Sequence, residues 1–442
     1  MINYIRVFII FLLSATAFSA FAQNSATTSS PYSQYGLGLY DEPLLPLARG
    51  MGGIGTGLSK TPDGLSFINI INPASYSSIT LTTIDIGAFA NIVSLSRTGF
   101  TSQTSSNFRL SHVAFGIPVS RHSAVTFGIL PYADLGYNYK QTNTVALNHS
   151  PIGVDTSATQ ESVYSGDGGL SKAYAGYGFS VGNFSFGGNV AYIFGKENQN
   201  RQVQYPDLPS ALNTNVQNSI SVGGVNYDYG VQYNLKLSET SRFTFGYSGS
   251  AGSKINSANS FIVSHYTLNA DGTQNLVTDS TTYTNTQGTL TLPQIHRFGI
   301  TYEKDLKYLI GADFKIGQWS NLNINGVNAG LQNNQSFAIG GQITPNINSL
   351  SSYWAVVDYR LGFNYDNTYI NVNNTNIKQY ALTFGLGLPI PNTSRTNYYK
   401  VNFSAELGRR GSLNNSLVQE NYINLHLGFT INEKWFQKYK FD

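Results

Sequence analysis

The sequence predicts an all-β protein, a transmembrane antiparallel β-barrel of about 14 strands with an N-terminal hatch segment in its lumen. Three observations favour this fold class. Apolar and polar residues alternate over most of the chain, which is the period of a half-buried strand. The alternating segments often run for about ten residues, the length that a tilted strand needs to cross a bilayer. Their polar face carries Ser, Thr, Asn, Gly and Tyr with few charges, as in a barrel interior and unlike the water-facing side of a soluble sandwich.

The first residues and the composition indicate an exported protein. Residues 1–22 have the features of a signal peptide, with Arg6 before a short apolar run and a cleavage site that ends at Ala22. The chain has no cysteine, which excludes a disulfide scaffold and thiolate metal sites. Charged residues are 11% of the chain, against roughly 25% in soluble proteins. The net charge of +3 is too small to indicate nucleic-acid binding. Because the chain has a signal peptide and the composition of a membrane barrel, we expect it in the outer membrane after cleavage near Ala22.

The individual strands follow from the alternation, which is clearest in residues 421–432, 398–408, 380–388 and 184–194. In the first of these, Ile, Leu and Phe occupy one face, while Tyr, Asn, His, Gly and Thr occupy the other. The pattern gives about 14 strands, an even number as in single-chain bacterial barrels. They are expected near 82–98, 106–119, 122–142, 170–181, 183–196, 216–237, 241–264, 288–303, 307–318, 334–344, 351–366, 376–389, 395–410 and 419–432.

The expected connections alternate in length. Those after even-numbered strands are short, whereas most of those after odd-numbered strands are longer and rich in Asn, Thr and Ser. Short periplasmic turns opposite long extracellular loops are typical of membrane barrels, and a sandwich gives no reason for this order. The long loops are expected at 143–169, 197–215, 265–287 and 319–333.

The N-terminal segment differs from the rest. It is dense in glycine and has no sustained period, yet Ile54, Leu58, Phe67 and Ile70 give it more apolar surface than a solvated linker carries. A lumen surrounded by about 14 strands is open unless something fills it. We therefore expect four parts: signal peptide 1–22, lumenal hatch 23–81, barrel 82–432 and short periplasmic tail 433–442.

Two stretches carry a family resemblance. The first is the hatch motif Arg49, Gly50, Gly52 and Gly53, followed by Asn72, Pro73 and Ala74; the second runs from Glu420 through the closing strand to Phe436. They resemble the FadL/OMPP1/TodX outer-membrane transport family of Gram-negative bacteria, in a form typical of Bacteroidetes. The resemblance implies passive uptake of hydrophobic molecules such as long-chain fatty acids or aromatic hydrocarbons. It also implies an apolar pocket above the hatch and a lateral exit through a kink in the third strand.

The third expected strand contains Leu130, Pro131 and Tyr132. Proline has no N–H for the ladder and is normally absent from paired strands. Pro131 therefore marks either the lateral gap that the resemblance implies or a simple bulge at the barrel rim.

Charges within the strands are few and are expected to face the lumen. On the lipid face, each Lys or Arg would cost about 2–4 kcal/mol near the midplane. By alternation Lys400 and Glu406 point inward, and we expect the same of Arg360. We interpret such charges first as ion pairs that hold the hatch, and second as a means for Arg360 or Lys400 to steer a substrate carboxylate.

Neither catalysis nor a cofactor is expected. The six histidines have no ligand spacing, so no metal site is predicted. The Gly50–Gly55 run matches G-x-G-x-x-G but lacks the strand, helix and acidic residue of a dinucleotide site, and we interpret it as close packing. A barrel hydrolase whose Ser and His meet only in space is a minor alternative.

The favoured function is a channel for hydrophobic small molecules, with membrane lipid and an apolar ligand as partners. The alternative is a FadL-like barrel that transports nothing and acts as an adaptor subunit of a secretion or assembly complex, with other outer-membrane proteins as partners. An apolar pocket and a gap in the wall would favour the channel. A packed lumen and a large docking surface would favour the subunit.

Overall fold

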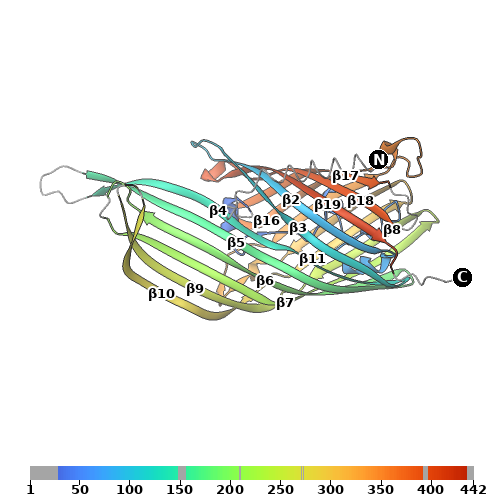
Figure 1. Ribbon diagram of the computed structural model, residues 1–442, viewed down its shortest axis with the longest axis horizontal. Coiled ribbons are helices and arrows are strands. Elements are labelled where there is room, and N and C mark those ends of the chain that lie inside the picture. Colours follow the sequence, from blue (N-terminus) through green and yellow to red (C-terminus); the bar gives the residue numbers. More distant parts are fainter. Residues whose placement is uncertain are drawn as a thin grey trace.

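The computed structural model describes residues 28–147, 156–208, 211–269, 271, 273–391 and 397–435. The predicted signal peptide and residues 436–442 of the predicted tail lie outside the described residues. The described chain forms an antiparallel sheet that closes on itself, so the predicted barrel is confirmed (Figure 1). None of the helices in these ranges is long and apolar enough to cross a bilayer.

The wall has 14 strands, as predicted, and closes where β19 pairs with β2 from Gln419↔Ser96 to Glu433↔Thr82. Each wall strand pairs with the next wall strand in chain order, and the chain makes two insertions between wall strands, at 251–294 and 318–333. The strands are β2 (Thr82–Ser96), β3 (Gln103–Ser120), β4 (Ser123–Leu147), β5 (Thr156–Val181), β6 (Phe184–Gln204), β7 (Asn213–Ser238), β8 (Ser241–Ser250), β11 (Ile295–Lys304), β12 (Tyr308–Gly317), β15 (Asn334–Ile343), β16 (Asp358–Val372), β17 (Thr375–Ile390), β18 (Tyr398–Gly411) and β19 (Gln419–Glu433).

Two longer strands and one short hairpin are inserted between wall strands. The seventh and eighth predicted strands are each interrupted, which separates β9 (Lys254–Leu268) from β8 and β10 (Gln274–Thr291) from β11. A small hairpin of β13 (Asn323–Ile324) and β14 (Val327–Asn328) follows the turn η4 (Trp319–Asn321). The eleventh strand begins later than predicted, at Asp358, because η5 (Tyr353–Ala355) occupies the preceding residues; η6 (Asn414–Ser416) lies between β18 and β19.

The alternation read from the sequence separates the two faces of the wall. Leu382, Phe384 and Leu407 are 43%, 43% and 46% exposed on the outer face, where lipid covers them. Thr383, between Leu382 and Phe384, and Ser404, three positions before Leu407, are each 1% exposed because they face the filled lumen.

Three of the four predicted long loops, 143–169, 197–215 and 265–287, are largely strand over their described residues. β4, β5, β6 and β7 have 25, 26, 21 and 26 residues, more than the 9–11 that cross a bilayer. With β9 and β10 they form a sheet that extends far beyond the other wall strands, at the left of Figure 1. We call this part the outer sheet.

The described hatch residues, 28–81, lie inside the barrel (Figure 1, blue). Their regular elements are short: η2 (Pro31–Gln34), β1 (Leu39–Tyr40), α2 (Pro46–Arg49) and η3 (Pro73–Ser78). The apolar side chains that set this segment apart in the sequence are buried, with Ile54 and Leu58 at 0% exposed.

Candidate functional site

Backbone of the hatch lies directly against backbone of the wall. A Cβ atom on Gly340 or Gly362 would come closer than 3.0 Å to the backbone of Met51 or Gly52. Gly52 and Gly53 have φ of +74° and +89°, which few other residues adopt. The predicted close packing of the glycine run is therefore observed, and glycines of the wall strands lie on the other side of these contacts.

Close contact with the wall also fixes the predicted Asn72-Pro73-Ala74 stretch of the hatch. The side chain of Asn72 accepts a hydrogen bond from the Ala74 N–H at 3.1 Å and so caps η3. It donates to the Thr56 carbonyl at 2.7 Å. A Cβ on Gly187 of β6 would collide with the backbone of Pro73.

Arg49 of the hatch motif begins a chain of charges that reaches the wall. Its guanidinium lies 2.5 Å from Asp41, and Asp41 also binds Arg109 of β3 at 2.6 Å. Arg109 in turn contacts Asp134 of β4 at 2.8 Å. Burial alone would raise the pKa of Asp41, but Arg49 and Arg109 outweigh it and lower that pKa. These four residues tie the hatch to β3 and β4.

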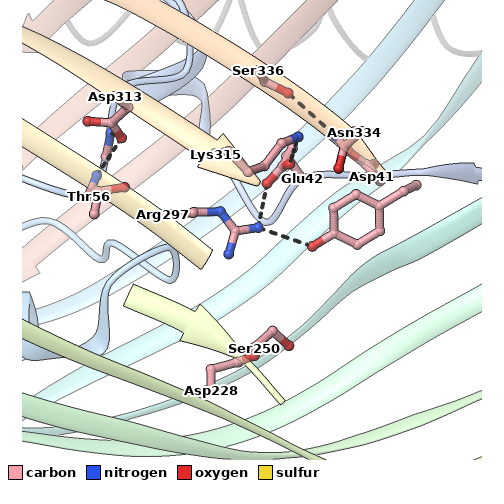
Figure 2. A network of polar contacts seen from close by, with 12 residues as sticks. Asp41, Glu42, Thr56, Asp228, Ser250, Arg297, Asp313, Lys315, Asn334 and Ser336 are labelled. Carbon is pink, nitrogen blue, oxygen red and sulfur yellow. Dashed lines mark hydrogen bonds and ion pairs between the residues drawn. The ribbon is translucent and has the colours of Figure 1, made fainter. Parts of the chain in front are cut away.

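A second acidic residue of the hatch binds the opposite side of the wall (Figure 2). Glu42 accepts from Arg297 of β11 at 2.8 Å and from the Lys315 amino group of β12. Burial favours the neutral form of Glu42, yet the two cations lower its pKa to about 2. Asp313 accepts from the backbone N–H of Thr56 at 2.7 Å, which fixes a further turn of the hatch.

The three predicted lumen charges are all buried inside the barrel, at 4%, 8% and 8% exposed for Arg360, Lys400 and Glu406. Lys400 binds Asp63 of the hatch and also Asp358 of β16, at 2.7 Å. Arg360 lies 3.0 Å from the same Asp358. Glu406 accepts from the Tyr422 hydroxyl at 2.9 Å. Lys400 thus links hatch and wall, whereas the described contacts of Glu406 and Arg360 include no hatch carboxylate.

An apolar layer closes the lumen toward the outer ends of the strands. Leu37 of the hatch, Leu290 of β10 and Leu322 are each 0% exposed in it. The rings of Trp319 and Tyr369 stack with centroids 4.0 Å apart. Hatch and wall therefore share one packed core here.

A cavity of about 250 Å³ remains between hatch and wall. The resemblance implied an apolar pocket, but this cavity is mixed, with twelve ionic side chains beside eight apolar ones such as Phe89 and Val93. Burying an apolar molecule against charges that are already paired gains little and removes their remaining solvation. The charged residues are Asp41, Glu42, Arg49, Arg109, Asp134, Arg297, Asp313, Lys315, Asp366, Glu406, Arg410 and Glu420.

The predicted residues Leu130, Pro131 and Tyr132 lie where two wall strands part. β3 and β4 pair only between Val113↔Ile129 and Ser120↔Ser123, so Leu130 is the first residue of β4 beyond that ladder. The β4–β5 register shifts between Pro131 and Ala133, which is a bulge. The hatch fills the beginning of the opening, since β1 pairs with Ala133 and Asp134 and the Asp41 N–H donates to the Tyr132 carbonyl at 3.0 Å. We call the separation of β3 and β4 the wall gap.

The hatch carboxylates Asp41 and Glu42 were not singled out from the sequence, nor were their partners Arg109 and Arg297. Two adjacent acidic residues in a nearly uncharged apolar segment were the available signal. No group of three or more His, Asp or Glu side chains within the described ranges has a metal-binding arrangement.

Comparison with models of known protein families identifies the family of this chain. A model of the BamG family matches residues 1–442. The chain belongs to the BamG family. No curated protein matches this BamG-family chain.

Solved structures share the fold of this BamG-family barrel at low sequence identity. A FadL homologue of Pseudomonas aeruginosa has a TM-score of 0.56 at 11% identity, over 90% of this chain and 100% of that one. The toluene transporter TbuX of Ralstonia pickettii has a TM-score of 0.54 at 14% identity, over 88% and 98%. The toluene transporter TodX of Pseudomonas putida has 0.52 at 12%, over 90% and 99%. The predicted resemblance to FadL-type barrels is thereby confirmed for the fold, which is that of an outer-membrane barrel.

Proposed function

We propose that this BamG-family barrel is a non-transporting structural subunit of an outer-membrane protein assembly. The packed lumen is the observation that carries the proposal. A passage through the barrel would require the hatch to leave wall contacts made by backbone, ion pairs and the apolar layer together. The outer sheet offers the surface for other proteins, because β4 to β7 extend well beyond bilayer length.

A specific observation favours a second candidate, a channel for hydrophobic molecules with lateral exit at β4. The wall gap begins at Leu130, next to the Pro131 bulge. Two of the similar structures are named as toluene transporters. The charged cavity is the argument against this candidate, because an apolar ligand would meet buried ion pairs.

Native mass spectrometry of the protein, extracted gently from its own membrane, tests both candidates. The subunit proposal predicts a stoichiometric protein partner and no tightly held apolar small molecule. A lone barrel that carries fatty acid or another apolar mass would reject it in favour of the channel. As a control, the same protein refolded from denaturant in pure detergent should carry neither mass.

A further inference from the structure

The outer part of β4 has an edge that no described strand covers. β4 pairs with β5 as far as Leu147↔Thr156, but its ladder with β3 ends at Ile129. The hatch uses the first part of this edge through β1 and Ser33. From Tyr137 to Leu147 no strand in the described ranges pairs with this side of β4.

Gly136 shows which backbone groups point to this edge. The Ser33 hydroxyl donates to the Gly136 carbonyl and accepts from the Gly136 N–H, both at 3.0 Å, so both groups face away from β5. In an antiparallel strand the N–H and C=O of one residue share a side, and the side alternates with each residue. Asn138, Lys140, Thr142 and Thr144 therefore direct their backbone groups to the uncovered edge.

This edge has few of the features by which proteins protect strand edges. The β10 edge, at the other side of the outer sheet, has two register shifts against β9, and such bulges discourage strand addition. The β4–β5 ladder has none between Ala133 and Leu147. Between residues 138 and 147, Lys140 is the single charged side chain of this edge, and its amino group lies 2.9 Å from Glu161 of β5. Residues 141–147 are uncharged and include three β-branched side chains, which suit a paired strand.

We propose that an extended segment of another protein at the outer face adds to β4 as a strand along residues 138–147. The inference rests on the proposed function and names its mode of docking. A bilayer takes about 9–11 strand residues, so the segment of β4 that starts at Ser123 leaves the membrane before residue 138. An exposed row of backbone donors and acceptors at that height matches another peptide backbone and matches neither a lipid chain nor an apolar ligand.

A proline substitution tests the proposal directly. Thr142→Pro removes one edge N–H and places a ring where the added strand would lie, but leaves the β4–β5 hydrogen bonds intact. The amount of protein partner that co-purifies with the barrel should be about tenfold or more lower for this variant than for the unaltered chain. Thr142→Ala, which keeps the N–H, should retain the partner. Heat-dependent gel mobility should show both variants folded.

A photo-crosslinking residue at position 144 identifies the occupant. The expected product joins position 144 to one continuous segment of the partner. A crosslink to residues 23–27 of the same chain would overturn the inference, since the chain would then cover its own edge. Normal partner retention by Thr142→Pro would overturn strand addition and leave the subunit function standing. Absence of any protein partner in the unaltered chain would overturn the proposed function itself.

Discussion

Replacing Lys400 with Met should loosen the hatch. Lys400 binds Asp63 and Asp358, whose side chains are 4% and 1% exposed. After the change Asp358 keeps Arg360 at 3.0 Å, but Asp63 loses its cation. Leaving a buried charge unpaired costs about 3–5 kcal/mol. Asp63 retains hydrogen bonds from Thr61 at 2.6 Å and the Leu65 N–H at 3.1 Å, so we expect the lower end, about 3 kcal/mol.

Two measurements check this value. Urea unfolding of the protein in lipid vesicles gives the free energy of unfolding, and proteolysis of residues 28–81 gives the fraction of hatch that is released. A loss of about 3 kcal/mol corresponds to roughly 150-fold more released hatch if release is the event that exposes the segment. The double variant Lys400→Met with Asp63→Leu should recover much of the loss, because no carboxylate is then left unpaired.

Lys140→Met is the matched control. Its side chain is 62% exposed in the pair with Glu161, and such surface pairs contribute about 0–1 kcal/mol. If Lys400→Met changed neither quantity more than this control does, the assignment of Lys400 as a link between hatch and wall would be wrong.

Three further outcomes are expected. The contribution of Glu42 is complete above its ordinary pKa of 4.5 and is lost as the pH falls toward about 2, so pepsin should cleave the hatch faster at pH 2 than at pH 4.5, with a smaller difference in Glu42→Gln. Gly362→Ala should speed hatch proteolysis about tenfold or more by forcing Met51 and Gly52 from the wall, whereas Gly188→Ala, whose Cβ meets only ordinary contacts, should not. Deleting residues 24–75 should raise small-solute conductance in planar bilayers, and unchanged conductance would mean that the segment does not fill the lumen.

The sequence was sufficient to predict the wall strands wherever lipid lies on one face of the wall and a polar lumen on the other. The alternation around Leu382 and Leu407 is such a case, because two different surroundings impose a period of two. It failed for the parts of β5 and β6 beyond the membrane, where water surrounds both faces and residues such as Thr159 and Asn200, expected in loops, need no alternation. In this part of the protein, pairing with neighbouring strands stabilises the strand conformation, and the local sequence does not indicate such pairing.

The charge network was only partly predictable for a similar reason. Alternation places Lys400 on the lumen side, but it does not say that Asp63, far away in the chain, is its partner. The partners of Asp41 and Glu42 depend on how the hatch turns inside the barrel. That path is fixed by three-dimensional packing, and no local pattern in the hatch encodes it.

The reciprocal glycine contacts imply an order of assembly. Gly52 donates its N–H to Thr383 at 2.8 Å, across 331 positions of the chain, and similar contacts join the hatch to wall strands all around the lumen. Surfaces that fit this closely leave no route for threading a folded segment through a finished cylinder. We therefore expect the hatch to be in place before the β19–β2 seam closes the cylinder. A barrel made without its first residues should then be unable to accept them afterwards as a separate peptide.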